Sequence, residues 1–394
     1  MNRSPEERRV AEIMAERTGT CADDWYLVYR ARHGMLVALE AVREELGEGH
    51  VVTQLLTCCT AVDPILAAGL EPVYAEISRC AASICPEKLE MPARTRAVML
   101  QHTYGIVDER DSALLAEKAH AAGALVIEDC AHGLGRMART AGGRAVADIS
   151  VHSFGVEKML HTQFGGAIWV NPDASFASVR SRIRQRMEAL PVAGSHLTSL
   201  TRTFVFWNRV YNHLPHGMAR ALRQTLTAVG LFEPAVSDEE RRGAVSHEPL
   251  RPSSEICQRV IDAFAALDGD MRTRAEATAT YAAELADVPG VELFSSGCTD
   301  PAQPLLKFPI LVGDRQTADR ITEEVCAAGY YTSTWYRPYL GPGVLDEAAY
   351  RVPADTRSIP SCMRIIDTVA TLPTDQGEAG ARAVAAIVRR VVSS

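Results

Sequence analysis

The sequence contains no long apolar run. No stretch reaches the roughly 20 apolar residues that a helix needs to span a bilayer. The opening segment, MNRSPEERRVAEIMAERTG, is charged and lacks the apolar centre of a secretion signal. Internal repeats, low-complexity tracts and flexible linkers are also missing. From these absences we expect a cytoplasmic protein without a membrane span.

The ten cysteines lack the spacing of a metal site or a disulfide framework. No C-x-x-C pair occurs, and no His/Cys cluster has zinc-like spacing. Cys58 and Cys59 are adjacent, and the other eight are scattered. In a reducing compartment such cysteines behave as small apolar residues, so we expect most of them to be buried and no metal to be bound.

The chain also lacks an excess of positive charge. Its formal net charge is −8, which gives no general attraction to nucleic acid or to anionic lipid. Hydrophobic residues make up 47% of the sequence and charged residues 23%, as in ordinary globular proteins. A length of 394 residues favours two domains.

The first half of the sequence alternates strand-like and helix-like segments. The strand-like segments are 50–57, 71–78, 95–105 and 124–135, and the helix-like segments are 34–47, 61–70 and 110–123. This alternation is typical of an α/β fold with a mostly parallel sheet, in which ligands bind beyond the carboxyl ends of the strands. We expect a short N-terminal segment (1–14) followed by a large domain (15–250).

Residues 178–246 interrupt the alternation. They mix arginines and aromatic residues at helical spacing, which indicates a helical insertion. Such an insertion can pack against a domain or a subunit, and a membrane-surface or lipid contact is the alternative. From 255 to 394 we expect a smaller α+β domain. A long helix is expected at 248–268, before the main part of this domain, which has a strand at 305–312 and helices at 317–329 and 377–392.

Lys158 has an unusual setting. It lies between Val156 and Met159, in a loop between two apolar strands of DISVHSFGVEKMLHTQFGGAIWV. Burial lowers the pKa of an amine and makes it a nucleophile toward an aldehyde, most often that of pyridoxal phosphate (PLP). The ring nitrogen of PLP needs a carboxylate. Asp129 can supply it at the end of a strand, with Glu128 on the opposite face.

A phosphate group would need backbone amides and hydroxyls. The start of the first α/β helix, RHGM at 32–35, and Ser153 can provide them. Each signal has an ordinary alternative: a loop lysine is usually solvated, and EDCAHG can be a plain strand end. The same residues taken together are more specific.

Together these segments resemble the DegT/StrS-type sugar aminotransferases, which are fold type I PLP enzymes. VIEDCAHGLG and SFGVEKMLHTQFGG are similar to the family's segments around its aspartate and its lysine, with 158 − 129 = 29 residues between the two. HTYG, GLEPVYAEIS, TSTWYRPYLGP and ATLPTD are similar to further family segments. The resemblance covers roughly residues 20–390, apart from 178–246.

The resemblance implies a fold and a set of roles. The large domain would hold a mostly parallel, seven-stranded type of sheet, and the small domain would follow it. Lys158 would form a Schiff base with the cofactor and carry protons, and Asp129 would pair with the ring nitrogen. His132 would lie beside the phenolic oxygen of the cofactor, although it can also be an ordinary loop histidine. The protein would be a homodimer with shared active sites.

The phosphate of the cofactor would bind at a second group of residues. The resemblance assigns this group to Ser153 and to the amides of Gly34 and Met35, although Ser153 can also cap a turn. Met35 replaces the family's small hydroxyl residue. The family's stacking aromatic falls on Cys58, which can pack on a ring but cannot stack.

Two further departures lie nearby. The family's G-E-G-G is Gln163-Phe164-Gly165-Gly166 here, and its asparagine that reaches the neighbouring subunit aligns near Pro249. Phe164 can restore stacking from another direction. Because Lys158 and Asp129 are kept while these positions differ, the sequence supports the use of PLP more strongly than it supports amino transfer as the reaction.

Three functions therefore stay open. The first is a biosynthetic aminotransferase of the kind found in secondary metabolism. Its small-molecule partners would be a glutamate- or glutamine-like donor and a ketone acceptor, such as a nucleotide-linked sugar or a cyclitol. The second is a PLP-dependent elimination, substitution or decarboxylation of an amino acid. The third is a noncatalytic PLP-binding or scaffold protein that uses the insertion. In the expected homodimer, the aromatic residues Phe204, Phe206, Trp207 and Tyr211 of the insertion offer apolar surface at an interface, or they belong to the core.

Overall fold

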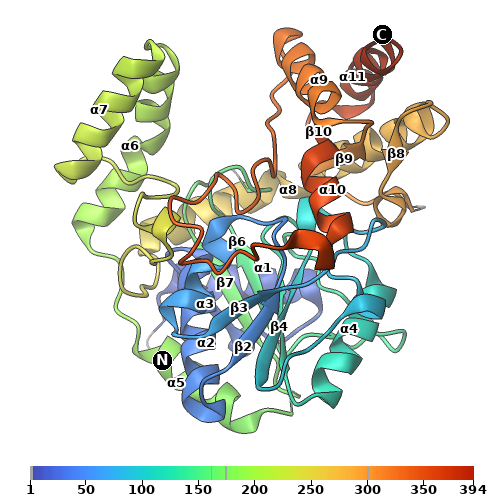
Figure 1. Cartoon of the computed structure of the whole chain (residues 1–394). Coiled ribbons are helices and arrows are strands. Elements are labelled where there is room, and N and C mark those ends of the chain that lie inside the picture. Colours follow the sequence, from blue (N-terminus) through green and yellow to red (C-terminus); the bar gives the residue numbers. More distant parts are fainter. Residues whose placement is uncertain (1–2, 161, 174, 300) are drawn as a thin grey trace.

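The protein is built around one seven-stranded sheet, which lies at the centre of the body in Figure 1. The computed structural model describes residues 3–160, 162–173, 175–299 and 301–394. The strand order is β1-β7-β6-β5-β4-β2-β3. The strands are β1 (Trp25–Val28), β2 (His50–Thr53), β3 (Glu71–Tyr74), β4 (Thr95–Gln101), β5 (Leu125–Asp129), β6 (Ile149–Ser153) and β7 (Gly166–Val170). The pairs from β3 to β6 are parallel and β7 is antiparallel to both neighbours, so the predicted mostly parallel sheet is confirmed.

Period-two alternation decides which face of the sheet each residue covers. In β5, Leu125 and Ile127 belong to the core shared with α2 (Ala31–Leu46), whereas Val126 belongs to the core shared with α4 (Glu109–Ala121). Both faces are therefore buried, as parallel sheets require. The same alternation places Asp129 on the α2 side of the sheet and Glu128 on the α4 side.

Helices cover both faces of the sheet. α2 and α5 (Ala177–Ala189) pack on one face, with the short α3 (Asp63–Ala67) beside them, and α1 (Pro5–Thr18) and α4 pack on the other. Short 3-10 helices occur at Ala22–Asp24, Cys59–Ala61, Pro86–Lys88, Thr103–Gly105, Glu240–Arg242, Ser295–Cys298 and Thr356–Ser358.

The predicted helical insertion forms a hairpin of α6 (Ser195–Asn212) and α7 (His216–Ala228), which stands away from the sheet in Figure 1. Of the two alternatives for its aromatic residues, interface or core, two residues follow the core alternative. Phe204 and Tyr211 are 5% and 3% exposed, because they lie on the face of α6 that packs against Phe232. Phe206 is 59% exposed, and Trp207 is half-buried.

A second, three-stranded antiparallel sheet lies in the C-terminal part, in the order β10-β9-β8. Its strands are β8 (Glu292–Leu293), β9 (Lys307–Leu311) and β10 (Val369–Pro373), and its helices are α9 (Arg315–Ala327), α10 (Pro360–Thr368) and α11 (Gly377–Val392). The predicted strand and both predicted helices of this part are confirmed. The division into domains near 250–255 stays a prediction.

One long helix, α8 (Ser254–Leu285), joins the two sheets. Its first half packs on the large sheet through Val260 and Phe264, and its second half packs on the small one, where Tyr281 contacts Phe308. One continuous helix therefore connects the large sheet to the small sheet.

The cysteines are less buried than predicted. Four are buried, at positions 59, 130, 257 and 362, three are half-buried, and Cys21, Cys80 and Cys326 are exposed. The exposed three lie in loops or on a solvent-facing helix side, where no apolar neighbour covers them. Within the residues described above, none of the helices is long and apolar enough to cross a membrane.

Candidate active site

A cavity of about 650 Å³ opens at the carboxyl ends of three neighbouring strands. Gln101, Asp129 and Ser153 end β4, β5 and β6, and all three line the cavity. Parallel α/β sheets bind ligands at this position, and the volume suits a cofactor with a substrate. Six of the seven predicted site residues line the cavity: Met35, Cys58, Asp129, His132, Ser153 and Lys158.

The carboxylate of Asp129 is held by two donors. Its Oδ1 accepts a hydrogen bond from the Ala131 amide at 2.9 Å, and its Oδ2 accepts one from Nε2 of Gln101 at 3.3 Å. The residue is only 9% exposed. Each carboxylate oxygen has further lone pairs, so Asp129 can still accept a hydrogen bond from a protonated ring nitrogen in the cavity.

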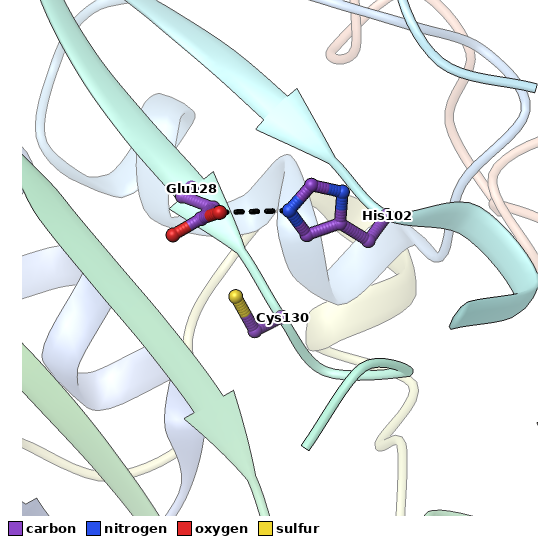
Figure 2. A group of neighbouring side chains, drawn as sticks. All are labelled: His102, Glu128 and Cys130. Atoms are coloured by element: carbon purple, nitrogen blue, oxygen red, sulfur yellow. Dashed lines mark hydrogen bonds and ion pairs between the residues drawn. The ribbon is translucent and has the colours of Figure 1, made fainter. Parts of the chain in front are cut away.

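On the other face of the same strand end, Glu128 lies in a closed hydrogen-bond network. Figure 2 shows its carboxylate against the His102 ring, where Nε2 and Oε1 are 2.8 Å apart. The Ala138 amide and the Ser150 hydroxyl also donate to Glu128. Burial alone would raise the pKa of this carboxyl, but the hydrogen bonds hold the pKa below its usual value. The network fixes the end of β5 and with it the direction of Asp129.

Cys130 completes the group in Figure 2, and a metal ion could in principle bind there. Ligand atoms of His102, Glu128 and Cys130 lie within 4.8 Å of one another. However, both oxygens of Glu128 already accept hydrogen bonds. Burial and the negative charge of Glu128 also raise the pKa of the Cys130 thiol, whereas a metal ligand must be a thiolate. We therefore assign this group a structural role.

The loop that carries Lys158 connects β6 to β7 and returns through two glycines. Gly165 has a φ of 107°, which side chains rarely adopt. A Cβ on Gly166 would lie 2.8 Å from the Ala31 amide nitrogen and 2.9 Å from the His152 carbonyl oxygen. Glycine is therefore required for β7 to pass this close to the start of α2, and this passage holds the lysine loop at the cavity.

The amine of Lys158 lies inside this cavity, although the residue as a whole is half-buried. Burial lowers its pKa, against the neighbouring Cys58, Asp129 and Glu157, which favour the charged form. Its Nζ lies 5.3 Å from the centre of the Trp335 ring. A lysine with a lowered pKa is neutral over a wider pH range, so it can act as a nucleophile and as a proton carrier.

His132 is enclosed by groups from distant parts of the chain. Its Nδ1 accepts a hydrogen bond from the Tyr104 amide at 3.0 Å, and its Nε2 lies 3.0 Å from the hydroxyl of Tyr336. Its ring stacks on Trp335 at 5.2 Å with an interplanar angle of 13°. Burial and then the charge of Lys158 lower the pKa of His132 well below its ordinary value, which keeps the imidazole neutral.

The start of α2 and the end of β6 offer hydrogen-bond donors on another wall of the cavity. Arg30, at the N-cap of α2, makes no side-chain cap, and Ala31 and Arg32 line the cavity. The first amides of a helix lack partners within the helix and attract anions. The Gly155 amide donates to Ser153 Oγ at 3.2 Å, which leaves the hydroxyl proton of Ser153 for a ligand.

Gly34 and Met35 lie differently from the sequence-based expectation. Because α2 begins at Ala31, the amides of Gly34 and Met35 fall in the helical hydrogen-bond ladder, and the free amides come earlier. Gly34 does not line the cavity, and a Cβ there would meet Ile168 of β7 at 3.4 Å. Met35 lines the cavity with its side chain.

Cys58 and Phe164 line the cavity where the family pattern is broken. The hydroxyl of Thr60 donates to Cys58 Sγ at 3.0 Å. A hydrogen bond from Cys59 lowers the pKa of the Cys58 thiol against the effect of burial, and Thr60 adds to this. Phe164 packs edge-on against Phe204 at 5.4 Å, so it belongs to the hairpin's aromatic cluster.

Sequence reasoning gave no role to several residues of the cavity. These are Gln101, Trp335 and Tyr336, together with Asn208 and Arg223 of the hairpin. The only sequence signal for Trp335 and Tyr336 was the match of TSTWYRPYLGP to a family segment. Nothing in that match indicated that the segment reaches His132, because the contact joins residues 204 positions apart.

A family model matches about half of the chain. The model of the DegT/DnrJ/EryC1/StrS aminotransferase family matches residues 27–230. This range includes Asp129, Ser153 and Lys158, but it ends before Trp335 and Tyr336.

Curated relatives match over a shorter stretch. GDP-perosamine synthase of Caulobacter vibrioides is 30% identical over 161 residues, which cover 40% of this chain and 42% of the relative. L-glutamine:scyllo-inosose aminotransferase of Streptomyces griseus is 28% identical over 184 residues, which cover 45% of this chain and 41% of the relative. The chain thus aligns with about two-fifths of the length of each relative.

Solved structures extend the likeness to the whole chain. The crystal structure of NtdA from Bacillus subtilis, with its bound cofactor PMP, aligns with a TM-score of 0.69 at 15% identity. The alignment covers 100% of this chain and 78% of that one. At this identity the likeness concerns the fold, and it confirms the predicted fold class.

Proposed function

Because the chain belongs to the DegT/DnrJ/EryC1/StrS aminotransferase family, we propose that it is an aminotransferase that uses pyridoxal phosphate. Glutamate or glutamine is the proposed amino donor. A ketone on a nucleotide-linked sugar or a cyclitol is the proposed acceptor, since two relatives are named for such compounds. The observation that carries the proposal is that Lys158 and Asp129 line one cavity.

The residues of the cavity fit this cofactor. Asp129 keeps an acceptor for the ring nitrogen, and Lys158 offers an amine with a lowered pKa. The uncapped start of α2 and the hydroxyl of Ser153 suit a phosphate group. When bound, pyridoxal phosphate supplies an electron sink for a carbanion next to nitrogen.

In this proposal the chain's own groups handle protons and orientation. Lys158 Nζ would move a proton in both halves of the reaction, away from the donor carbon in the first half and to the acceptor carbon in the second. Asp129 would pair with the ring nitrogen and favour its protonated form, because an opposite charge stabilises a cation. Ser153 and the first amides of α2 fix one end of the cofactor and limit its rotation.

The cavity has room for an acceptor on the hairpin side. Phe204, Asn208 and Arg223 of the hairpin line that side. The guanidinium of Arg223 lies 4.8 Å from the centre of the Tyr211 ring, which orients it while leaving its donors exposed. We therefore propose that the insertion shapes the acceptor pocket.

The protein should release a limited amount of product from an amino donor alone. PLP-loaded protein mixed with glutamine or glutamate, without acceptor, should form one equivalent of the matching 2-oxo acid per active site and then stop. The reason is that the transferred amino group has no ketone to move to. Quantifying the 2-oxo acid by mass spectrometry checks this, and adding a competent acceptor should restart its release.

Other outcomes of this experiment favour the other two functions. Continuous product formation from one amino acid alone indicates elimination, substitution or decarboxylation. Complete absence of product with every amino acid, in a protein that still binds the cofactor, indicates a binding or scaffold role. The amount of 2-oxo acid therefore separates all three hypotheses.

We also propose a homodimer in which the hairpin takes part. Phe206 and Met218 are 59% and 60% exposed on the hairpin, and such apolar surface is usually covered by a partner. Sedimentation at micromolar concentration should show a dimer, and Phe206→Glu with Met218→Glu should shift it toward monomer. Leu345→Glu, at an apolar residue that is 45% exposed outside the hairpin, serves as the control. A wild-type protein that is monomeric and fully active would contradict the proposal.

A further inference from the structure

The hydrogen bonds of His132 determine which of its nitrogens carries the proton. The Tyr104 amide can only donate, so Nδ1 of His132 must present a lone pair to it. The imidazole is buried and neutral, so its single proton lies on Nε2. Nε2 is 3.0 Å from the Tyr336 hydroxyl, and therefore His132 donates to Tyr336. The proton of His132 is thus used inside the protein and is not presented to a ligand.

The hydroxyl proton of Tyr336 is consequently available. Its oxygen already accepts from His132, which leaves its own O–H to donate elsewhere. Tyr336 lines the cavity and is 6% exposed. Trp335 stacks on its ring at 5.5 Å with an angle of 3°, and Tyr104 stacks at 6.2 Å with an angle of 27°. Both rings limit the movement of the Tyr336 ring. The titratable groups around its hydroxyl are His132, Cys58, Tyr104, Asp129 and Glu157.

The other polar walls of the cavity suit three parts of pyridoxal phosphate. Asp129 suits the ring nitrogen, Lys158 suits the aldehyde carbon, and Ser153 with the start of α2 suits the phosphate. The one polar substituent left is the phenolic oxygen. It lies on one side of the carbon that bears the aldehyde, and the phosphate arm lies on the other side. The Trp335 ring lies 5.3 Å from Lys158 Nζ, so the Tyr336 stack borders the lysine end of the cavity.

We propose that Tyr336 donates a hydrogen bond to the phenolic oxygen of the bound cofactor, and that His132 orients the Tyr336 hydroxyl from behind. This inference rests on the proposed function, and it reassigns the contact that the family resemblance gave to His132. Tyr336 is then the residue that touches the cofactor, and His132 is a positioning residue. A C-terminal segment outside the matched range 27–230 thereby completes the cofactor site.

An absorbance titration of the PLP-loaded protein tests the proposal. In the loaded protein, the phenolic oxygen of the cofactor shares a proton with the nitrogen of Lys158. Without a hydrogen-bond donor from the protein, this oxygen is more basic, so the shared proton dissociates at a higher pH. Tyr336→Phe should therefore raise the midpoint of the titration by about one pH unit or more, the size expected for one hydrogen bond to a charged oxygen. His132→Phe should raise it by less, because the hydroxyl remains but loses its orienting donor.

Tyr104→Phe is the matched control. Tyr104 belongs to the same stack, but its hydroxyl donates to the Trp335 carbonyl at 2.8 Å. This variant loses an equally buried hydroxyl and should leave the midpoint where it is in the wild type. Thermal melting of each variant with and without cofactor shows whether it is folded.

A second measurement compares cofactor affinities and does not rely on a titration midpoint. Dissociation constants for pyridoxal phosphate and its 3-deoxy analogue, which lacks the phenolic oxygen, can be obtained from quenching of tryptophan fluorescence. The wild type and Tyr104→Phe should prefer pyridoxal phosphate, and Tyr336→Phe should lose about tenfold of that preference. An unchanged midpoint together with an unchanged preference in Tyr336→Phe overturns the inference. If wild-type protein gives no borohydride-stable adduct at Lys158, the proposed function fails instead.

Discussion

Lys158→Ala should lower amino transfer by about 10³-fold or more, because it removes both the nucleophile and the proton carrier. The alanine methyl group cannot move a proton, and the cavity has no second lysine in its lining. The measurement is kcat at saturating donor and acceptor. Noncovalent cofactor binding should persist in part, since Ser153 and the start of α2 are unchanged.

The sequence offers a matched control for this variant. It holds four lysines, at positions 88, 118, 158 and 307. Lys118 lies on α4, where it donates to the Pro86 carbonyl, far from the cavity lining. Lys118→Ala should keep wild-type turnover. Near-normal turnover in Lys158→Ala would show that Lys158 is structural, and the proposed function would fall with it.

Asp129→Asn should lower turnover by about 10²-fold to 10³-fold while the cofactor still links to Lys158. An amide has nearly the shape of the carboxylate, so the contact with the Ala131 amide can persist. It carries no charge, however, and cannot keep the ring nitrogen protonated. Turnover is therefore expected to fall because the cofactor ring withdraws electrons less strongly during the reaction.

Two measurements separate this effect from a loss of binding. Borohydride reduction followed by peptide mass mapping should still place the cofactor on Lys158 of Asp129→Asn. kcat should fall, whereas kcat of Asp262→Asn, on the solvent side of α8, should be unchanged. If Asp129→Asn turns over at the wild-type rate, another group holds the ring nitrogen.

The sequence was most informative where local patterns decide the structure. The alternation of strands and helices predicted the parallel sheet, and the ends of its strands placed Asp129 and Ser153 at one edge. The last helix was predicted at 377–392 and is observed at Gly377–Val392. These features depend on the spacing of apolar residues within one element, which can be read from the sequence directly.

The predicted helix boundaries were wrong where packing contacts outweighed the effect of a helix-breaking residue. The helix predicted at 248–268 is α8, which continues to Leu285 through Gly269. A glycine costs about 1 kcal/mol in a helix, and the apolar contacts on both sides of Gly269 outweigh that cost. The start of α2 was placed too late for a related reason, since Arg30 caps it without a recognisable capping side chain.

Long-range contacts could not be predicted at all. Phe204 and Tyr211 turned inward because Phe232, beyond the second helix of the hairpin, packs against them. Trp335 and Tyr336 reach His132 from the segment between α9 and α10. No local spacing contains this information, so the sequence predicted the acid and the lysine of the site but not its aromatic wall.

The distance of 204 residues between His132 and Tyr336 also sets an order of events during synthesis. At the usual 5–20 residues per second, the ribosome needs about ten seconds or more between making the one and the other. During that interval the nascent chain already carries Asp129 and Lys158, but nothing closes over them. The proposed site is therefore complete only after the segment with Trp335 and Tyr336 has been made, and a chain that ends before this segment lacks that wall of the cavity.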